Sequence, residues 1–406
     1  MKKLIFCFCF FIQSLIFTNA LFAQEKVLFK FNHQKDDASS YVSIVEEDVF
    51  YNGYLSHHSQ IVNRISSIIH DVDKDGTAQV TANYMTTEDS VSNFSKTALS
   101  WGTENTSNFK RKSDGELIIS DSLFMPTVRN VPLFPKYEVG IGETWTAKGK
   151  EVHDMRSYFN MTEPLIIPFE AKYKYVGNTN INNKNLCVID VDYEFFFQNT
   201  KDKIAKGSLF LATAGYSKQR LYWDQENGIL DHYTEEFRIK MSDVYNNLVE
   251  FRGVSKAEIT QAKFSNSKKN VEKLQKTVEN LKLKDVNIKE GSKGLTISIE
   301  NIQFEPDSAV LLDSEKKKLD LIATLLQDFS NDILITGHCA ERGSESARQV
   351  LSEQRAESVA SYLKQLGVRD AYHIFSQGKG STEPIASNAT EEGRQKNRRV
   401  EIIVLN

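Results

Sequence analysis

Apolar and polar residues alternate along several stretches between residues 24 and 254. In residues 77–84, Thr, Gln, Thr and Asn alternate with Ala, Val, Ala and Tyr; in residues 187–195, Cys, Ile, Val, Tyr and Phe alternate with Val, Asp, Asp and Glu. A period of two is typical of a β-strand with one buried face and one solvated face. Turn-forming pairs such as Asp75-Gly76 and Asn227-Gly228 separate these stretches. We therefore predict a β-rich domain over residues 24–254.

The same alternation is also typical of a membrane barrel, which presents apolar side chains to lipid and polar ones to its interior. Residues 229–239, however, place Asp231 and Glu235 on one face and His232, Glu236 and Arg238 on the other. Charge on both faces, and turns that do not alternate between short and long, favour a β-sandwich or half-barrel in water. The membrane barrel is the second interpretation.

Two local patterns in this domain suggest other structures. Ile61, Ile65, Ile68 and Ile69 fall on one helical stripe, which predicts a short helix over residues 59–69. The acidic run of residues 71–76 is similar to the first half of a calcium loop, but its twelfth position is Ala82, where a bidentate Glu is needed. We interpret that run as a hairpin turn.

Residues 255–285 change character, and residues 265–284 are rich in Lys, Glu and Asn. Val271, Leu274, Val278 and Leu281 follow one another at spacings of 3, 4 and 3, which indicates a helix with one apolar stripe. So short a heptad pattern is marginal as an isolated coiled coil. We expect a helical linker whose stripe docks on a neighbouring domain, with dimerisation as the alternative.

The last part of the chain, residues 286–406, alternates predicted strands with predicted helices. The strands contain Leu295 to Ile299, residues 333–335, 373–375 and 400–405. The first helix, capped by Asp313 or Ser314, has four inward positions: Leu319, Ile322, Ala323 and Leu326. The second carries an apolar stripe and ends at Gly367; the stripe is Leu351, Val359, Leu363 and Leu366. The order β, α, β, α, β, β predicts helices packed on one face of a mixed sheet, so the whole chain is assigned to the α+β class.

Several short blocks in this region occur in a fixed order. They are Gly337-His338, Glu341-Arg342-Gly343, Leu351-Ser352, Arg355-Ala356, Glu392-Gly393-Arg394 and Asn397-Arg398-Arg399-Val400-Glu401, with a strand and turn upstream at residues 302–308. In order and spacing they resemble the OmpA-like peptidoglycan-binding domain, which is shared by OmpA-type outer-membrane proteins, the peptidoglycan-associated lipoprotein and flagellar-motor stators. The resemblance covers about the last 120 residues and implies that this domain binds the peptidoglycan stem peptide.

The resemblance also implies roles for individual residues. Arg355 would grip a carboxylate of the stem peptide, for which a guanidinium is well suited. Its nearest acids in sequence, Glu353 and Glu357, lie two residues away and point to other faces of the helix. Arg398 would line the same pocket, and Asn397 would help to shape it.

At one position the sequence departs from the family. Three residues after the Gly of Gly-His the family carries Asp, which pairs with the ammonium of the diamino acid, but this chain has Ala340. Glu341 and Asp307 are the candidates to replace that carboxylate. The identity of the stem diamine therefore stays open.

The N-terminus predicts export. Residues 1–23 combine Lys2 and Lys3, an apolar run and a small-residue exit at Ala23, which is typical of a signal peptide. Cys7 and Cys9 lie inside the apolar run, so we expect no lipid anchor and a mature chain that begins at Gln24. Its 48 basic and 54 acidic residues give a formal charge of −6, which disfavours a nucleic-acid partner.

Other chemistry is not indicated by the sequence. Cys187 and Cys339 are interpreted as two lone thiols, with a disulfide as the alternative. His338 is interpreted as a loop-bracing residue, and the remaining histidines show no metal-ligand spacing. We find no catalytic motif and predict no enzyme, no cofactor and no metal site; an enzymatic β-rich domain is the weakest alternative.

The sequence thus predicts an exported envelope protein of the periplasm or outer membrane. It would bind peptidoglycan non-covalently through residues 286–406 and tether its β-rich domain to the wall, the outer membrane or an envelope protein. The alternative is a structural or partner-binding protein whose OmpA-like domain has lost peptidoglycan binding.

Overall fold

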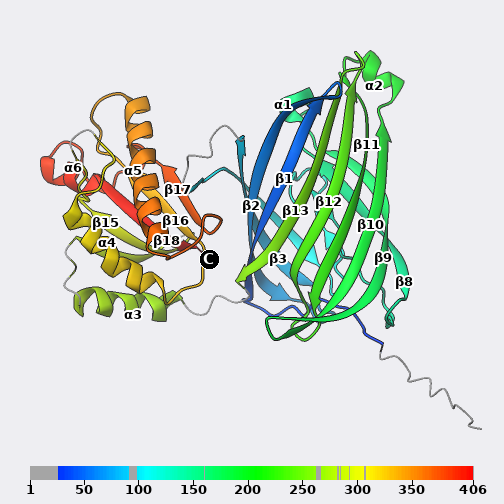
Figure 1. Ribbon diagram of the computed structural model, residues 1–406, viewed down its shortest axis with the longest axis horizontal. Coiled ribbons are helices and arrows are strands. Elements are labelled where there is room, and N and C mark those ends of the chain that lie inside the picture. Colours follow the sequence, from blue (N-terminus) through cyan, green and yellow to red (C-terminus); the bar gives the residue numbers. More distant parts are fainter. Residues whose placement is uncertain are drawn as a thin grey trace, which may run out of the picture.

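The computed structural model describes residues 26–90, 98–159, 161–261, 267–280, 283, 285–291, 293–305 and 308–405. The predicted signal peptide, Leu281 and Asp307 lie outside these ranges. Two bodies lie side by side: a large curved β-sheet and a smaller body of helices on a sheet (Figure 1). Within the described ranges, none of the helices has the length and apolarity needed to cross a membrane.

The large body is one antiparallel sheet of twelve strands, in the order β6-β5-β3-β2-β1-β13-β12-β11-β10-β9-β8-β7. The strands are β1 Ala38–Tyr51, β2 Tyr54–Val72, β3 Ala78–Ser90, β5 Thr103–Arg111, β6 Leu117–Ile118, β7 Val128–Arg129, β8 Thr144–His153, β9 Leu165–Ile181, β10 Lys184–Gln198, β11 Phe210–Asp224, β12 Ile229–Asp243 and β13 Leu248–Gln261. Two short helices, α1 Arg156–Phe159 and α2 Lys201–Ala205, lie in the loops. The sheet curves until its edges approach, and Asn130 Oδ1 near one edge accepts from the Leu117 amide at the other at 2.8 Å.

Alternation along the strands gives this sheet an apolar inner face and a charged outer face. On β9, Phe169, Ala171 and Tyr173 are buried, whereas the intervening Glu170 and Lys172 are exposed. The same pattern runs along β3 and β10, so the strands predicted at residues 77–84 and 187–195 are confirmed. Charge on the outer face is the reverse of the arrangement in strands that face lipid.

The helix predicted over residues 59–69 is wrong, because these residues belong to β2. Ile61, Ile65 and Ile69 are spaced by four, and a spacing of four returns to the same face in a strand as well as in a helix. All three line the inside of the curved sheet, whereas Ile68 is exposed on the outside. The β-branched side chains of these residues favour the strand, and pairing with β1 and β3 fixes it.

The acidic run at residues 71–76 forms the hairpin turn that the sequence predicts. It joins β2 to β3, with the Asp73 amide donating to the Thr77 carbonyl at 2.8 Å. Asp75 Oδ1 accepts from the Thr77 amide at 3.0 Å, and Gly76 adopts φ +83°. The carboxylate therefore stabilises the turn itself.

Aromatic residues fill the half of the interior next to β8–β11. Trp223 packs edge-on against Phe134 with ring centroids 4.8 Å apart, and Trp145 stacks on Tyr173 at 5.0 Å. Phe29, from the segment before β1, stacks on Phe134 at 5.5 Å. The main core of the β-rich domain thus lies on one side of its interior.

The smaller body is a mixed sheet with helices, in agreement with the predicted α+β class. Its elements are α3 Ser267–Asn280, β14 Val286–Gly291, β15 Gly294–Glu300, α4 Asp313–Leu326, β16 Ile333–His338, α5 Glu345–Gln365, β17 Ile374–Gly378, α6 Glu391–Asn397 and β18 Arg399–Leu405. The sheet order is β14-β15-β18-β16-β17-β4, and β4 Leu99–Ser100 comes from the first half of the chain. The sequence predicted neither β14, α6 nor the added strand β4.

Helix α3 docks on the smaller body, as predicted for the linker. Leu274 and Val278 are buried in the same cluster as Ile288 and Leu295, and Val271 packs against its margin. The apolar stripe of α3 is therefore used within the chain.

Two details of the other helices differ from the prediction. Leu312, rather than Asp313 or Ser314, is the N-cap of α4, and its side chain makes no capping hydrogen bond. On α5, Val359 and Leu363 are buried as expected, but Leu366 is the C-cap and is 37% exposed. Small residues complete the buried face of α5 instead: Ser352, Ala356 and Ala360.

The smaller sheet is covered on both faces. Helices α3, α4 and α5 cover one face. On the other face, Leu334 and Phe375 pack with Val42, Val62 and Met85 of β1, β2 and β3. Because both faces are covered, every residue of β16 and β18 is buried.

Candidate functional site

Glycines bring α5 into direct contact with the sheet at the carboxyl ends of β16 and β17. A Cβ on Gly337 would lie 2.1 Å from the Ser352 carbonyl oxygen, and one on Gly378 would lie 2.6 Å from the Glu353 amide. The Gly380 amide donates to Ser352 Oγ at 2.8 Å. These close approaches fix the position of α5 against β16 and β17.

Arg355 projects from the second half of α5 toward the loop at residues 304–311. Its Nε donates to the Ser308 carbonyl at 3.3 Å, and its guanidinium lies 4.8 Å from the centre of the Phe304 ring. An antiparallel bridge between Phe304 and Leu311 closes that loop. Backbone and ring contacts therefore orient the half-buried guanidinium.

The charge of Arg355 reaches the loop that follows β16. Burial raises the pKa of the Cys339 thiol, and the positive charges of Arg355 and Arg348 act in the opposite direction. Cys339 immediately precedes Ala340 and Glu341. Two guanidinium groups therefore act on one loop, an arrangement suited to an anionic ligand.

Arg348 was not singled out from the sequence. Its Nη1 donates to the Gly343 carbonyl at 2.5 Å, and its Nε is buried without a hydrogen-bond partner. The available signal was its spacing: it precedes Arg355 by seven residues, or two helical turns, and so shares its face of α5.

Asn397 is fully buried and shapes the facing loop at residues 385–388. Its Oδ1 accepts from the Ile385 and Ala386 amides at 2.8 and 3.0 Å, and its Nδ2 donates to the Ala386 carbonyl and to Asn388 Oδ1. Asn388 Oδ1 also accepts from the Glu341 amide at 3.2 Å. The two loops are therefore held together through the side chains of Asn397 and Asn388.

Arg398 lies at the end of α6 and pairs with an acid of the same helix. Its Nη2 donates to Glu391 Oε1 at 2.7 Å, and Arg394 Nε donates to Glu391 Oε2 at 2.8 Å. These hydrogen bonds hold the pKa of Glu391 below its usual value. A ligand carboxylate would have to share Arg398 with Glu391.

The remaining predicted site residues differ in how accessible they are. Ala340 is only 7% exposed, while Glu341 is exposed on the loop beside it. Asp307 lies outside the described residues. Of the two acids proposed to replace the family's Asp, Glu341 is the one within the described residues, and it directly follows Ala340.

His338 does not brace the loop, contrary to the prediction. It lies inside the sheet, with Nε2 3.7 Å from Glu401 Oε2, and neither ring nitrogen has a hydrogen-bond partner. Burial lowers the pKa of His338. Burial raises the pKa of Glu401, but His338 and Arg399 outweigh it and bring the pKa to about 2.

Comparison with known proteins identifies the family of the C-terminal domain. Residues 303–398 match the model of the OmpA family. The chain belongs to the OmpA family. The resemblance drawn from the sequence blocks is thus confirmed for the C-terminal domain.

The relatives of this OmpA-family domain include proteins named as peptidoglycan-binding and outer-membrane proteins. Over 104 residues the chain is 45% identical to the peptidoglycan-binding protein ArfA of Mycobacterium tuberculosis, covering 25% of this chain and 32% of ArfA. Over 121 residues it is 35% identical to the outer-membrane lipoprotein YfiB of Pseudomonas aeruginosa, covering 28% of this chain and 71% of YfiB. A solved structure of the peptidoglycan-associated lipoprotein from Burkholderia pseudomallei is 31% identical, covers 26% of this chain and 87% of that chain, and has a TM-score of 0.24. The chain spans about a third of the length of ArfA.

Proposed function

We propose that this protein binds peptidoglycan non-covalently through its OmpA-family domain and thereby tethers the β-rich domain to the cell wall. The observation that carries the proposal is the pair Arg348 and Arg355 on one face of α5, with Arg348 Nη1 donating to the Gly343 carbonyl, inside a domain whose relatives include peptidoglycan-binding proteins. A stem-peptide carboxylate is the natural partner of such a pair, because guanidinium groups bind carboxylates through two parallel hydrogen bonds.

The proposal includes export and a place in the envelope. The predicted signal peptide at residues 1–23 would deliver the mature chain across the inner membrane. The periplasm or the inner face of the outer membrane is the compartment in which residues 286–406 would meet peptidoglycan. Recognition is by binding, and we assign the domain no catalytic role.

A second function is supported by two departures from the family pattern. Ala340 removes the carboxylate that would hold a ligand ammonium, and Glu391 occupies Arg398. Both changes weaken a pocket for a zwitterionic stem peptide. The alternative is a protein that binds an envelope partner and no longer holds peptidoglycan.

Co-sedimentation with purified, insoluble peptidoglycan tests the proposal. The chain of residues 24–406 should pellet with the wall in a saturable manner. Arg355→Ala should lower its affinity ten- to a hundredfold, the usual loss for a charge-assisted hydrogen bond of about 1.5–3 kcal/mol.

The matched control is Arg220→Ala. Arg220 lies on the outer face of β11, where it pairs with Asp190 at 2.7 Å, and it should not affect pelleting. Absence of the unsubstituted chain from the pellet would establish the alternative. Equal pelleting of all three proteins would remove Arg355 from the site.

A further inference from the structure

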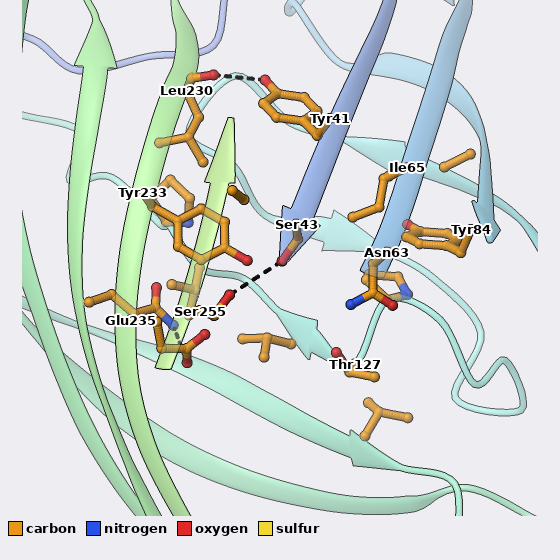
Figure 2. Close-up of a pocket in the computed structure, with 18 of the residues that line it drawn as sticks. Tyr41, Ser43, Asn63, Ile65, Tyr84, Thr127, Leu230, Tyr233, Glu235 and Ser255 are labelled. Carbon is orange, nitrogen blue, oxygen red and sulfur yellow. Dashed lines mark hydrogen bonds between the residues drawn. The ribbon is translucent and has the colours of Figure 1, made fainter. Parts of the chain in front are cut away.

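A cavity of about 670 Å³ lies inside the curved sheet of the β-rich domain. In Figure 2, Tyr41, Asn63, Ile65, Tyr84 and Tyr233 surround this space, from strands on different sides of the sheet. The volume falls in the range of about 300–1,000 Å³ that is typical of small-molecule sites. The cavity is therefore large enough for an organic ligand.

Small inward-facing residues explain why the sheet is not filled on this side. Ser43 of β1, Ser255 and Ala257 of β13, and Ala82 of β3 all line the cavity. Ser43 and Ser255 satisfy each other through a hydrogen bond of 3.3 Å between their hydroxyls (Figure 2). The large aromatic residues gather next to β8–β11, so the space beside β1–β3 stays open.

The walls of this space are largely apolar along its length. Every second residue of β2 from Ile61 to Ile69 lines the cavity, and Ile61, Ile65 and Ile69 alternate there with the polar Asn63 and Ser67; β12 contributes Tyr233 and Phe237. The inward-facing residues of β1 run from Tyr41 to Glu47, six residues apart, or roughly 20 Å at about 3.3 Å per residue. An extended apolar chain fits the shape of this wall.

One end of the cavity is closed and carries an arginine. The segment before β1 crosses this end, with the Phe31 amide donating to the Ser113 carbonyl at 2.7 Å and His33 Nδ1 3.0 Å from the Gly76 carbonyl oxygen. Arg111, the last residue of β5, lies beneath it with its guanidinium 5.1 Å from the centre of the Phe31 ring.

Arg111 has no counterion in the described part of the chain. Its guanidinium lies over the rings of Phe31 and Phe109, and the phenols of Tyr41 and Tyr84 are the ionisable groups that act on its pKa. Burial raises the pKa of each phenol to about 12, so both are neutral at pH 7. Burial also lowers the pKa of Arg111, which reflects the cost of an enclosed charge without a partner.

Five acids line the cavity, and none of them forms an ion pair with Arg111 within the described residues: Asp37, Glu47, Glu151, Asp154 and Glu235. Asp154 pairs with Arg156 instead. Glu235 Oε1 accepts from Ser217 Oγ at 2.6 Å, and Glu151 Oε1 accepts from the Tyr193 hydroxyl at 2.6 Å. Burial raises the pKa of Glu235, and it raises that of Glu47 to about 7. None of them neutralises Arg111.

We propose that this cavity binds a single-chain amphiphile, with an anionic headgroup against Arg111 and an apolar tail along the wall formed by Ile61, Ile65, Ile69, Tyr233 and Phe237. The shared ligand chemistry is a carboxylate or phosphate on one acyl chain. An anion at Arg111 supplies the missing counterion, and a tail removes the exposed apolar wall from water.

Binding to the delipidated chain of residues 24–406 tests this proposal. Palmitate and a lysophosphatidic acid with the same acyl chain provide the two headgroups, hexadecanol lacks the charge, and inorganic phosphate lacks the tail. Affinities are measured by displacement of a fluorescent fatty acid, and stoichiometry by native mass spectrometry. We expect one molecule per chain, tight binding of at least one charged amphiphile, at least tenfold weaker binding of hexadecanol and none of phosphate.

Two variants locate the ligand. Arg111→Met should weaken binding of the charged amphiphile ten- to a hundredfold and leave hexadecanol unchanged, because only the charged head contacts the guanidinium. Ile65→Trp should abolish binding of both by filling the cavity. The matched control Arg220→Met, on the outer face of the sheet, should bind like the unsubstituted chain, and circular dichroism checks that each variant is folded.

The comparison of palmitate with lysophosphatidic acid identifies the headgroup. A preference for either one supports the proposal. Absence of saturable binding by any amphiphile would overturn it, as would equal affinities for charged and neutral ligands in the unsubstituted chain. If a variant failed to fold, the comparison of charged and neutral amphiphiles on the unsubstituted chain would still test the proposal.

Discussion

Asn397 is the residue on which the two loops of the candidate peptidoglycan site most depend. Its buried amide makes four hydrogen bonds to residues 385–388. Asn397→Ala leaves the Ile385 and Ala386 amides without their acceptor, and we expect a loss of about 3 kcal/mol in the free energy of unfolding. Hydrogen exchange at these two amides should accelerate in parallel.

The control for this substitution is Asn185→Ala, because Asn185 is exposed on β10. It should change the free energy of unfolding by less than about 0.5 kcal/mol. Unaltered exchange at Ile385 and Ala386 in Asn397→Ala would show that the loop is held by other contacts.

Ala340 tests the chemistry of the missing carboxylate. We expect Ala340→Asp to strengthen binding to peptidoglycan whose stem diamine has a free ammonium, about tenfold, through one charge-assisted hydrogen bond. Peptidoglycan in which that amine has been acetylated is the control and should show no gain. If Ala340→Asp bound peptidoglycan with the free amine no more tightly than the unsubstituted chain does, Glu341 would already pair with the ammonium. The added carboxylate would then only repel Glu341.

The sequence predicted site residues unevenly, and the reason is physical. Arg355 and Asn397 could be named because their blocks follow the family in order and spacing. The pairing of Arg398 with Glu391 depends on how α6 folds back, and α6 was not predicted. Arg111 could not be recognised from the sequence, because its lack of a counterion among the described residues follows from the closure of the sheet.

Among the elements, α5 is positioned by backbone contact with the sheet. Gly337→Ala would place a methyl group 2.1 Å from the Ser352 carbonyl oxygen, so α5 must move away from β16. We expect a loss of about 2–3 kcal/mol in the free energy of unfolding, together with weaker peptidoglycan binding because Arg355 lies on α5. Urea unfolding and co-sedimentation measure the two effects.

A glycine with space around it provides the comparison. A Cβ on Gly140 would come no closer than 3.4 Å to the flexible side chain of Glu143. Gly140→Ala should therefore leave both measurements unchanged. If Gly337→Ala did the same, the close approach of α5 to β16 would not be required.

Element type was predictable where the hydrophobic period was unambiguous. Cys187 to Phe195 alternates with period two and forms part of β10. In β2, by contrast, Ile61, Ile65 and Ile69 satisfy both periods, and only the pairing of β2 with β1 and β3 fixes the strand. Where apolar residues recur at a spacing of four, the local pattern therefore cannot distinguish a strand from a helix.

On the scale of the whole molecule, the two bodies share an interface that no local pattern reveals. Strand β4 pairs Leu99 with Phe375 and Ser100 with Ser376, across a large separation in sequence. Arg64 Nε also donates to Asp332 Oδ2 at 2.6 Å, with side chains only 6% and 0% exposed. Such contacts depend on tertiary structure, which composition and periodicity do not encode.

Loss of one partner of the buried pair Arg64 and Asp332 should strongly destabilise the interface between the two bodies. Arg64→Met leaves the Asp332 carboxylate buried, and we expect a loss of about 3–5 kcal/mol in the free energy of unfolding. The double variant Arg64→Met/Asp332→Leu should recover part of it, because the buried carboxylate is removed together with Arg64, while His373 loses its hydrogen-bond partner. Urea unfolding measures the free energy of unfolding of both variants. Equal losses in the single and double variants would contradict the argument.

His373 makes this interface sensitive to pH. Its Nδ1 lies 2.8 Å from Asp332 Oδ1, and Asp370 and Glu258 face Nε2 at 3.8 and 4.0 Å. Burial lowers the pKa of His373, but the hydrogen bond with Asp332 and the charges of the three acids outweigh it and raise the pKa above 6.5. A group whose pKa is raised on folding contributes its full stability below its unfolded pKa and loses it as the pH rises through the folded value.

We therefore expect the stabilising effect of His373 to be complete below about pH 6.5 and to decline above it. Asp332 has its pKa lowered despite burial, by His373 and Arg64, so its own contribution is lost only in acid, below about pH 3.8. The measurement is the difference in free energy of unfolding between the unsubstituted chain and His373→Asn, taken from pH 5.5 to 9. It should shrink steadily with rising pH. The control is His57→Asn, on the exposed start of β2, which should leave the free energy of unfolding nearly unchanged throughout this range. If the effect of His373→Asn did not depend on pH, the ring would act by packing and not by its charge.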